Sequence, residues 1–79
     1  MQKSIYTKQH QRLCDLLVQA RTDADLMQVQ VAKRLGRPQS FVSKYENGER
    51  RLDVVEFLAV AKALELDPAE VLDELRAQR

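Results

Sequence analysis

Cysteine occurs only once in the 79 residues, at position 14, so the chain can form no internal disulfide. Disulfide frameworks belong to oxidising compartments, and the lack of one here favours the reducing cytoplasm. The sequence also has no apolar run long enough to cross a bilayer and no hydrophobic segment of the secretory type. We therefore expect a cytoplasmic protein that has no membrane partner.

Glycine and proline are almost as scarce, with two of each, and runs of β-branched residues are few. These scarcities favour helices. The apolar fraction of 44% is close to that of an ordinary globular protein, although 79 residues lie near the lower limit for folding without disulfides or a metal. The composition predicts one all-helical domain, at residues 7–77, after a flexible segment at 1–6.

An excess of one charge is also missing, because the formal net charge is only +1. The charges are nevertheless unevenly distributed. Residues 1–51 carry ten Lys or Arg and five Asp or Glu, a balance of +5, whereas residues 52–79 carry three and seven, a balance of −4. Such a split either orients the basic half towards a polyanion or is an ordinary patchwork of surface charge.

Apolar spacing and capping residues predict five helices. Four are expected at about 7–22, 28–35, 38–46 and 68–77, and one more follows an Asp53 cap. Thr7 or Ser4 is the expected cap of the first helix, and Asp67 is the expected cap of the last. Gly36 suits the positive φ that is common after a helix, and Pro38 suits the first residue of the next one.

The fourth predicted helix is apolar almost all round. Asp53 and Glu56 have the spacing of a capping box at its start. Apolar residues then fill nearly every position (Val54, Val55, Phe57, Leu58, Ala59, Val60, Ala61, Ala63 and Leu64). A helix of this kind is usually buried on all sides, so we expect it to be the central core helix.

The stretch from Gln28 to Arg51 contains the pattern that points to a function. Two helices of about eight residues are joined by a short turn, as in the helix-turn-helix plan, whose second helix enters the major groove of DNA. The polar residues expected on the exposed side of that helix are Gln39, Ser40, Ser43 and Lys44. Amide groups can pair with adenine edges there, although an ordinary solvated helix face would look similar.

The residues from Leu13 to Leu72 resemble the five-helix, lambda-repressor-like DNA-binding domain of the phage Cro/cI repressor family, also called XRE-like. The matching elements are Arg21, Leu26, Gln28, Val31-Ala32, Leu35-Gly36, Gln39-Ser40, Val42-Ser43 and Tyr45-Glu46-Asn47-Gly48, followed by an apolar helix. The resemblance covers about three quarters of the chain. It implies an all-α fold of five helices with the helix-turn-helix at about 28–46.

The resemblance also implies roles for individual residues. The base-reading positions correspond to Gln39, Ser40 and Lys44, and the phosphate-binding positions correspond to Gln28 and Asn47. Three arginines are further candidates for the sugar–phosphate backbone: Arg37, Arg50 and Arg51. For the last two, plain surface is an equal alternative. Arg21 and Glu46 fall on a pair that forms a partly buried salt bridge between the first and third helices in related domains.

The sequence departs from the family pattern at several positions. Met27 stands where the family often has a Thr or Ser cap, so that cap is replaced or absent. Arg37-Pro38 replaces an apolar residue followed by Ser or Thr, and Asp23-Ala24-Asp25 lacks a glycine that is common after the first helix. Phe41 is larger than usual for its position and either contacts thymine methyl groups or extends the core.

His10 and Cys14 are four residues apart on the first helix and share a face. They could form half of a metal site or a thiolate–imidazole pair, but the chain has no other Cys or His to complete it. We expect a surface histidine and a small half-buried cysteine. We therefore expect no cofactor, no metal and no enzymatic activity.

The predicted function is a sequence-specific DNA-binding transcriptional regulator. We expect a repressor that binds double-stranded DNA as a homodimer on a palindromic operator, because one short recognition helix reads few base pairs. Self-association is expected to use Val54, Val60, Val71 and Leu75, or Leu52 together with Val54. The alternative is an antitoxin or co-regulator whose main partner is another protein.

Overall fold

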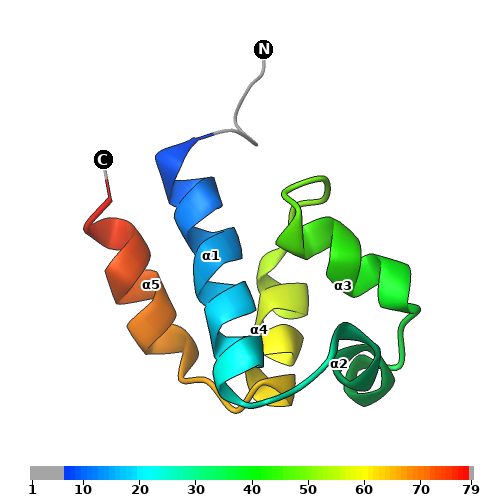
Figure 1. Ribbon diagram of the computed structural model, residues 1–79. Coiled ribbons are helices and arrows are strands. Elements are labelled where there is room, and N and C mark those ends of the chain that lie inside the picture. Colours follow the sequence, from blue (N-terminus) through cyan, green and yellow to red (C-terminus); the bar gives the residue numbers. More distant parts are fainter. Residues whose placement is uncertain (1–6, 79) are drawn as a thin grey trace.

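Five helices make up residues 7–78, the part of the chain that the computed structural model describes (Figure 1). They are α1 (Lys8–Asp23), α2 (Gln28–Leu35), α3 (Gln39–Glu46), α4 (Val54–Ala63) and α5 (Pro68–Arg76). No strand occurs within these residues, and the all-α prediction is confirmed. None of the described helices is long and apolar enough to cross a membrane. The segment 1–6, which we expected to be flexible, lies outside the described residues.

Polar side chains start three of the helices as predicted. Thr7 caps α1 and Asp67 caps α5, each by accepting a hydrogen bond from a backbone N–H of the first turn. At the start of α4 the Asp53 carboxylate accepts from the Glu56 N–H at 2.7 Å, and the Glu56 carboxylate accepts from the Asp53 N–H at 3.0 Å. These bonds satisfy N–H groups that have no partner within the helix, so local chemistry fixes where each helix begins.

The helices α2 and α3 begin without a side-chain acceptor of this kind. At α2 the missing cap of Met27 is partly replaced by Gln30, whose side-chain oxygen accepts from the Met27 N–H at 2.7 Å. Pro38 is the N-cap of α3, with ψ 154°, and the helix begins at Gln39. The prediction that Pro38 is the first helical residue was therefore wrong by one position, because this ψ is extended and a helical residue needs about −42°.

One hydrophobic core joins all five helices. Its fully buried large side chains are Leu17, Val31, Val42 and Val60, and Val71 of α5 is nearly as buried. Burying each such side chain contributes about 1.5–3 kcal/mol. The helix α1 packs against α5 and α3, and α2 packs against α3 and α4 (Figure 1). The α2–α3 pair is thus supported by α1 and α4, and α5 packs against those two helices.

The helix α4 is not buried on all sides, contrary to the prediction. Phe57 and Val60 face the core, but Val54 and Val55 are each 75% exposed and Leu58 is 48% exposed. The packing partners of α4 are α2 and α5, and within residues 7–78 no further layer covers its opposite face. A domain of this size leaves part of such a helix in solvent.

Candidate nucleic-acid interface

A short turn with a left-handed glycine places α3 against α2. Gly36 has φ 67° and ψ 32°, a conformation that costs a residue with a Cβ atom more than it costs glycine. The Arg37 N–H donates to the Ala32 carbonyl oxygen at 3.0 Å, which closes the end of α2. The chain therefore reverses within a few residues, as the helix-turn-helix plan requires.

The recognition helix α3 has one apolar face and one polar face. The buried residues are Phe41, Val42 and Tyr45. Of the predicted base-reading residues, Gln39, Ser40 and Lys44 are exposed, and Ser43 is half-buried. The arrangement brings an amide, a hydroxyl and an ammonium group to the surface within two turns of helix.

A chain of hydrogen bonds links the exposed start of α3 to the interior. Gln39 Nε2 donates to Gln28 Oε1 at 3.2 Å, and Gln28 Nε2 donates to Glu46 Oε1 at 2.8 Å. Because both ends of the Gln28 amide are engaged, rotating it would place a donor against a donor or an acceptor against an acceptor. Gln28 therefore holds the predicted base-reading amide in place from the neighbouring helix.

The same chain ends in a buried ion pair between α1 and α3. Arg21 Nε and Nη2 donate to the two Glu46 carboxylate oxygens at 2.6 and 3.1 Å, and Arg21 Nη1 donates to the Leu26 carbonyl oxygen at 2.9 Å. The two side chains are only 16% and 4% exposed. This is the position of the ion pair that the family resemblance implies, and its burial makes it part of the scaffold.

Two of the predicted phosphate-binding arginines converge on one acidic residue. Arg50 Nη1 and Nη2 donate to Glu56 Oε1 and Oε2 at 2.9 and 2.8 Å, and Arg37 Nη2 lies 3.6 Å from Glu56 Oε2. The hydrogen bonds from Arg50 lower the pKa of Glu56 to about 2 and raise the pKa of Arg50. Both guanidinium groups lie over the Phe41 ring, with Cζ 4.5 and 4.8 Å from its centroid.

Phe41 is therefore a core residue at the edge of the interface, with 8% of its surface exposed. Of the two roles left open by the sequence, the structure places it in the core. Its ring also packs edge-on against Tyr45, with the centroids 5.6 Å apart. Asn47 and Arg51, the remaining candidates for the phosphate backbone, are exposed after the end of α3.

Sequence reasoning missed Glu56 as a partner of the interface. Its place three residues after Asp53 gave it a capping role, and the carboxylate does fill that role through Oε1. The contacts to Arg50 and Arg37 depend on how the α3–α4 connector folds back, and helical spacing carries no signal for that. Only the excess of arginine before α4 hinted that an acidic partner was needed.

His10 and Cys14 are both buried, contrary to the prediction of a surface histidine and a half-buried cysteine. They are 7% and 3% exposed. The Cys14 thiol donates to the Tyr45 carbonyl oxygen at 3.3 Å and lies 3.8 Å from His10 Nε2. Burial lowers the pKa of His10, assisted by the charge of Arg51, and raises the pKa of Cys14.

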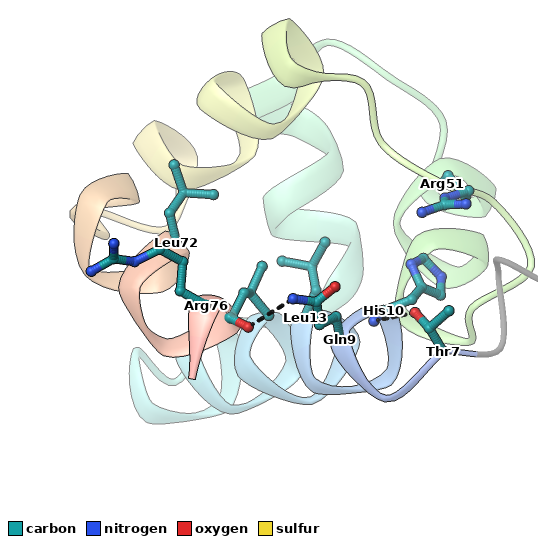
Figure 2. Close-up of a pocket in the computed structure, with 8 residues that line it drawn as sticks. Thr7, Gln9, His10, Leu13, Arg51, Leu72 and Arg76 are labelled. Carbon is teal, nitrogen blue, oxygen red and sulfur yellow. Dashed lines mark hydrogen bonds between the residues drawn. The ribbon is translucent and has the colours of Figure 1, made fainter. Parts of the chain in front are cut away.

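The connector after α3 explains this burial. The Cα of Gly48 approaches so closely that a Cβ atom there would lie 3.9 Å from Cys14 Sγ. Beside it, a shallow hollow is lined by Thr7, His10 and Arg51 near one end and by Leu72 and Arg76 of α5 at the other (Figure 2). Within residues 7–78, no group of three or more His, Cys, Asp or Glu side chains could hold a metal ion.

The fold and the polar face of α3 define a helix-turn-helix protein, and comparison with known proteins agrees. Residues 12–77 match the family model described as a helix-turn-helix domain. An XRE-family like protein from Pseudomonas syringae pv. tomato str. DC3000 is 52% identical, with 87% of this chain and 84% of that chain covered and a TM-score of 0.83. The chain belongs to the XRE-like helix-turn-helix family and is a DNA-binding transcription regulator.

Two restriction-modification controller proteins are also similar. C.AhdI from Aeromonas hydrophila is 31% identical, with 78% of this chain and 94% of that chain covered and a TM-score of 0.73. C.Esp1396I, solved as a tetramer in complex with its natural 35 base-pair operator, is 16% identical, with 89% and 92% covered and a TM-score of 0.79. The second likeness is one of fold alone. No curated protein matches the chain.

Proposed function

We propose that this protein represses transcription as a homodimer bound to a palindromic operator. The observation that carries the proposal is the fixed amide of Gln39 at the exposed N-terminal turn of α3. One of its N–H groups is engaged by Gln28 at 3.2 Å, which leaves the carbonyl oxygen and the second N–H for a base edge. Adenine presents the complementary acceptor and donor in the major groove.

The neighbouring side chains extend this contact along the groove. Ser40 and Lys44 are exposed one turn apart on α3, and half-buried Ser43 lies between them. We assign these residues to adjacent base pairs. The phosphate backbone on either side would be held by Gln28, Arg37, Asn47 and Arg51, and Gln28 also positions Gln39. Arg50, the remaining candidate, is paired with Glu56. Phosphate contacts fix the register of a protein on DNA, whereas base contacts select the sequence.

The homodimer is supported by exposed apolar side chains away from α3. Val54, Val55, Leu58 and Leu72 have between 48% and 75% of their surface in solvent. Val60 and Val71, which the sequence had also suggested for self-association, are buried at 0% and 6% exposure and are excluded from it. A dimer of this kind would present two copies of α3 to half-sites about one helical turn apart.

A second candidate function uses the same apolar residues for a different partner. An antitoxin or co-regulator would bind another protein through them, and its DNA binding would be secondary. The observation in favour of this candidate is the size of the exposed side chains on α4, since large apolar patches mark interaction sites. For either candidate we propose a cytoplasmic, non-catalytic protein, because its family consists of DNA-binding regulators.

Selection from a random-sequence DNA pool tests the proposal. We expect an enriched palindrome whose half-sites lie about 10 base pairs apart, and a dimer in sedimentation analysis of the complex. Gln39→Ala should weaken binding to the selected site by about 1–3 kcal/mol and relax the preference at one base pair. The matched control is Gln11→Ala, which removes an exposed glutamine of α1. It should change neither the affinity for the selected site nor the base preference. No enrichment, together with a tight protein partner, would favour the second candidate.

A further inference from the structure

Four side chains from four parts of the fold meet at α3. They are Arg37 from the α2–α3 turn, Phe41 from α3, Arg50 from the α3–α4 connector and Glu56 from α4. The Glu56 side chain is only 15% exposed, whereas those of Arg37 and Arg50 are 45% and 37% exposed. A largely covered carboxylate therefore sits beneath two guanidinium groups that reach the surface.

The two arginines are not equivalent in this cluster. Arg50 gives both terminal nitrogens to Glu56, at 2.9 and 2.8 Å, and Nη1 also donates to the Arg51 carbonyl oxygen at 2.8 Å. Arg37 lies 3.6 Å from the carboxylate, beyond hydrogen-bond distance, and its side chain donates no hydrogen bond to any of residues 7–78. Arg50 thus forms hydrogen bonds with both oxygens of the Glu56 carboxylate. The N–H groups of the Arg37 guanidinium are left available for another acceptor.

Phe41 restricts the position of the Arg37 guanidinium. The Arg37 guanidinium carbon lies 4.5 Å from the ring centroid, a distance at which the positive group is attracted to the face of the ring. A guanidinium held over the ring keeps N–H groups available, and a phosphate can accept two of them. Arg37 also lies two residues before Gln39, the first residue of α3.

We propose that Phe41, Arg50 and Glu56 are positioning residues for Arg37, which binds a DNA phosphate beside the N-terminus of α3. Arg50 neutralises Glu56 and so prevents that carboxylate from capturing Arg37, while Phe41 holds the Arg37 guanidinium over its ring. Arg50 itself makes no phosphate contact and acts only by positioning Arg37. This inference rests on the proposed DNA-binding function, and it gives Arg37 and Arg50 different roles at the interface.

Removing Arg50 should therefore impair DNA binding through Arg37. The nearest cation to the unpaired Glu56 carboxylate would then be Arg37, which needs to move by less than 1 Å to hydrogen-bond with it. That contact would turn the guanidinium away from DNA. Removing the charge of Glu56 at the same time should restore binding, because the competing carboxylate is gone. A direct phosphate contact of Arg50 predicts no such restoration.

The test is a set of affinity measurements on the selected operator and on unrelated DNA at several salt concentrations. Arg37→Ala should reduce binding about tenfold on both DNAs, the size expected for one charged hydrogen-bonding contact, and should reduce the slope of log affinity against log salt by about 0.9. Arg50→Gln should reproduce most of this loss. Arg50→Gln/Glu56→Gln should return to within about threefold of wild type. Phe41→Leu should weaken binding about two- to fivefold.

The Arg37→Ala background provides the control. Neither Phe41→Leu nor Arg50→Gln should weaken binding further in that background, because both act through the missing guanidinium. An additional loss from Arg50→Gln there, with a further fall in the salt slope, would show that Arg50 contacts phosphate itself and would overturn the inference. An Arg37→Ala protein with the DNA affinity of wild type would also overturn the inference. A wild-type protein that binds no DNA would instead overturn the proposed function.

The single variant Glu56→Gln separates a defect in DNA binding from a defect in folding. It keeps the shape of the side chain and an oxygen that can accept the Asp53 N–H, now 3.0 Å away. We expect its far-UV circular dichroism to match wild type and its operator affinity to stay within about threefold of wild type, with the salt slope undiminished. A tenfold loss in this folded variant would mean that Glu56 acts on DNA binding by another route and would overturn the inference.

Discussion

The Arg21–Glu46 pair should dominate the stability of the helix-turn-helix. Arg21→Met leaves a Glu46 carboxylate that is 4% exposed and has lost both of its charged hydrogen bonds to the first helix. A stranded buried charge of this kind costs about 3–5 kcal/mol. The whole domain is expected to be stable by only about 4–12 kcal/mol, from about 0.05–0.15 kcal/mol per residue. One substitution thus removes about a quarter or more of the folding free energy.

Urea unfolding followed by circular dichroism measures this loss. With a slope of about 1 kcal/mol/M for so small a domain, the midpoint should fall by about 3 M or more. The matched control is Arg12→Met, because the Arg12–Glu74 pair has a similar distance of 3.0 Å but side chains that are 39% and 44% exposed. An exposed pair contributes about 0–1 kcal/mol, so the midpoint should change little.

A double variant tests the physical reason. Arg21→Met/Glu46→Gln removes both charges and keeps an oxygen that can accept from Gln28, now 2.8 Å from the carboxylate. It should recover at least half of the lost stability, because most of the cost comes from the unpaired charge. An Arg21→Met protein within about 1 kcal/mol of wild type would refute the reasoning, since it would mean that the Glu46 carboxylate is effectively solvated.

Three further predictions concern the backbone, a cap and pH. Gly36→Ala should cost about 1–2 kcal/mol from its positive φ alone, since no atom lies within 4 Å of the added Cβ; a larger loss in thermal unfolding would indicate a clash. Asp53→Ala should cost about 0.5–2 kcal/mol, measured by urea unfolding, and no loss would mean that the Glu56 half of the capping box suffices. Because the pKa of His10 is lowered in the folded state, the neutral form stabilises the fold above the unfolded pKa of about 6.5, and this contribution is lost as pH falls below that value. His10→Gln should make the urea midpoint less dependent on pH than that of wild type between about pH 7.5 and 5.5.

The helices were predictable because their signals are local. Thr7, Asp53 and Asp67 cap the helices they were expected to cap, and Gly36 has the positive φ that its place after α2 required. The start of α3 was placed one residue early, since Pro38 has a φ suited to either side of the boundary and ψ decides between them. Propensity and spacing therefore fix which segments are helical, within one residue of the ends.

The errors concern packing between distant segments. His10 was expected at the surface although Cys14 and Leu17 follow it on the same helix face, because the connector at Gly48 that covers it comes 38 positions later. Val54 and Val55 looked buried because their composition is apolar, although no described helix reaches them. Side-chain pairing between Arg50 and Glu56 was likewise invisible, because it depends on the path of the α3–α4 connector.

The hydrogen-bond chain from Gln39 to Arg21 also has a consequence for how such proteins change their target. Exposure falls along it, from an exposed amide at Gln39 to a Glu46 side chain with 4% of its surface accessible. Replacing the outermost member should alter base preference at little cost to folding, whereas replacing the innermost should destabilise the domain strongly. New binding specificities can therefore accumulate at one end of the chain while the other end keeps the scaffold intact.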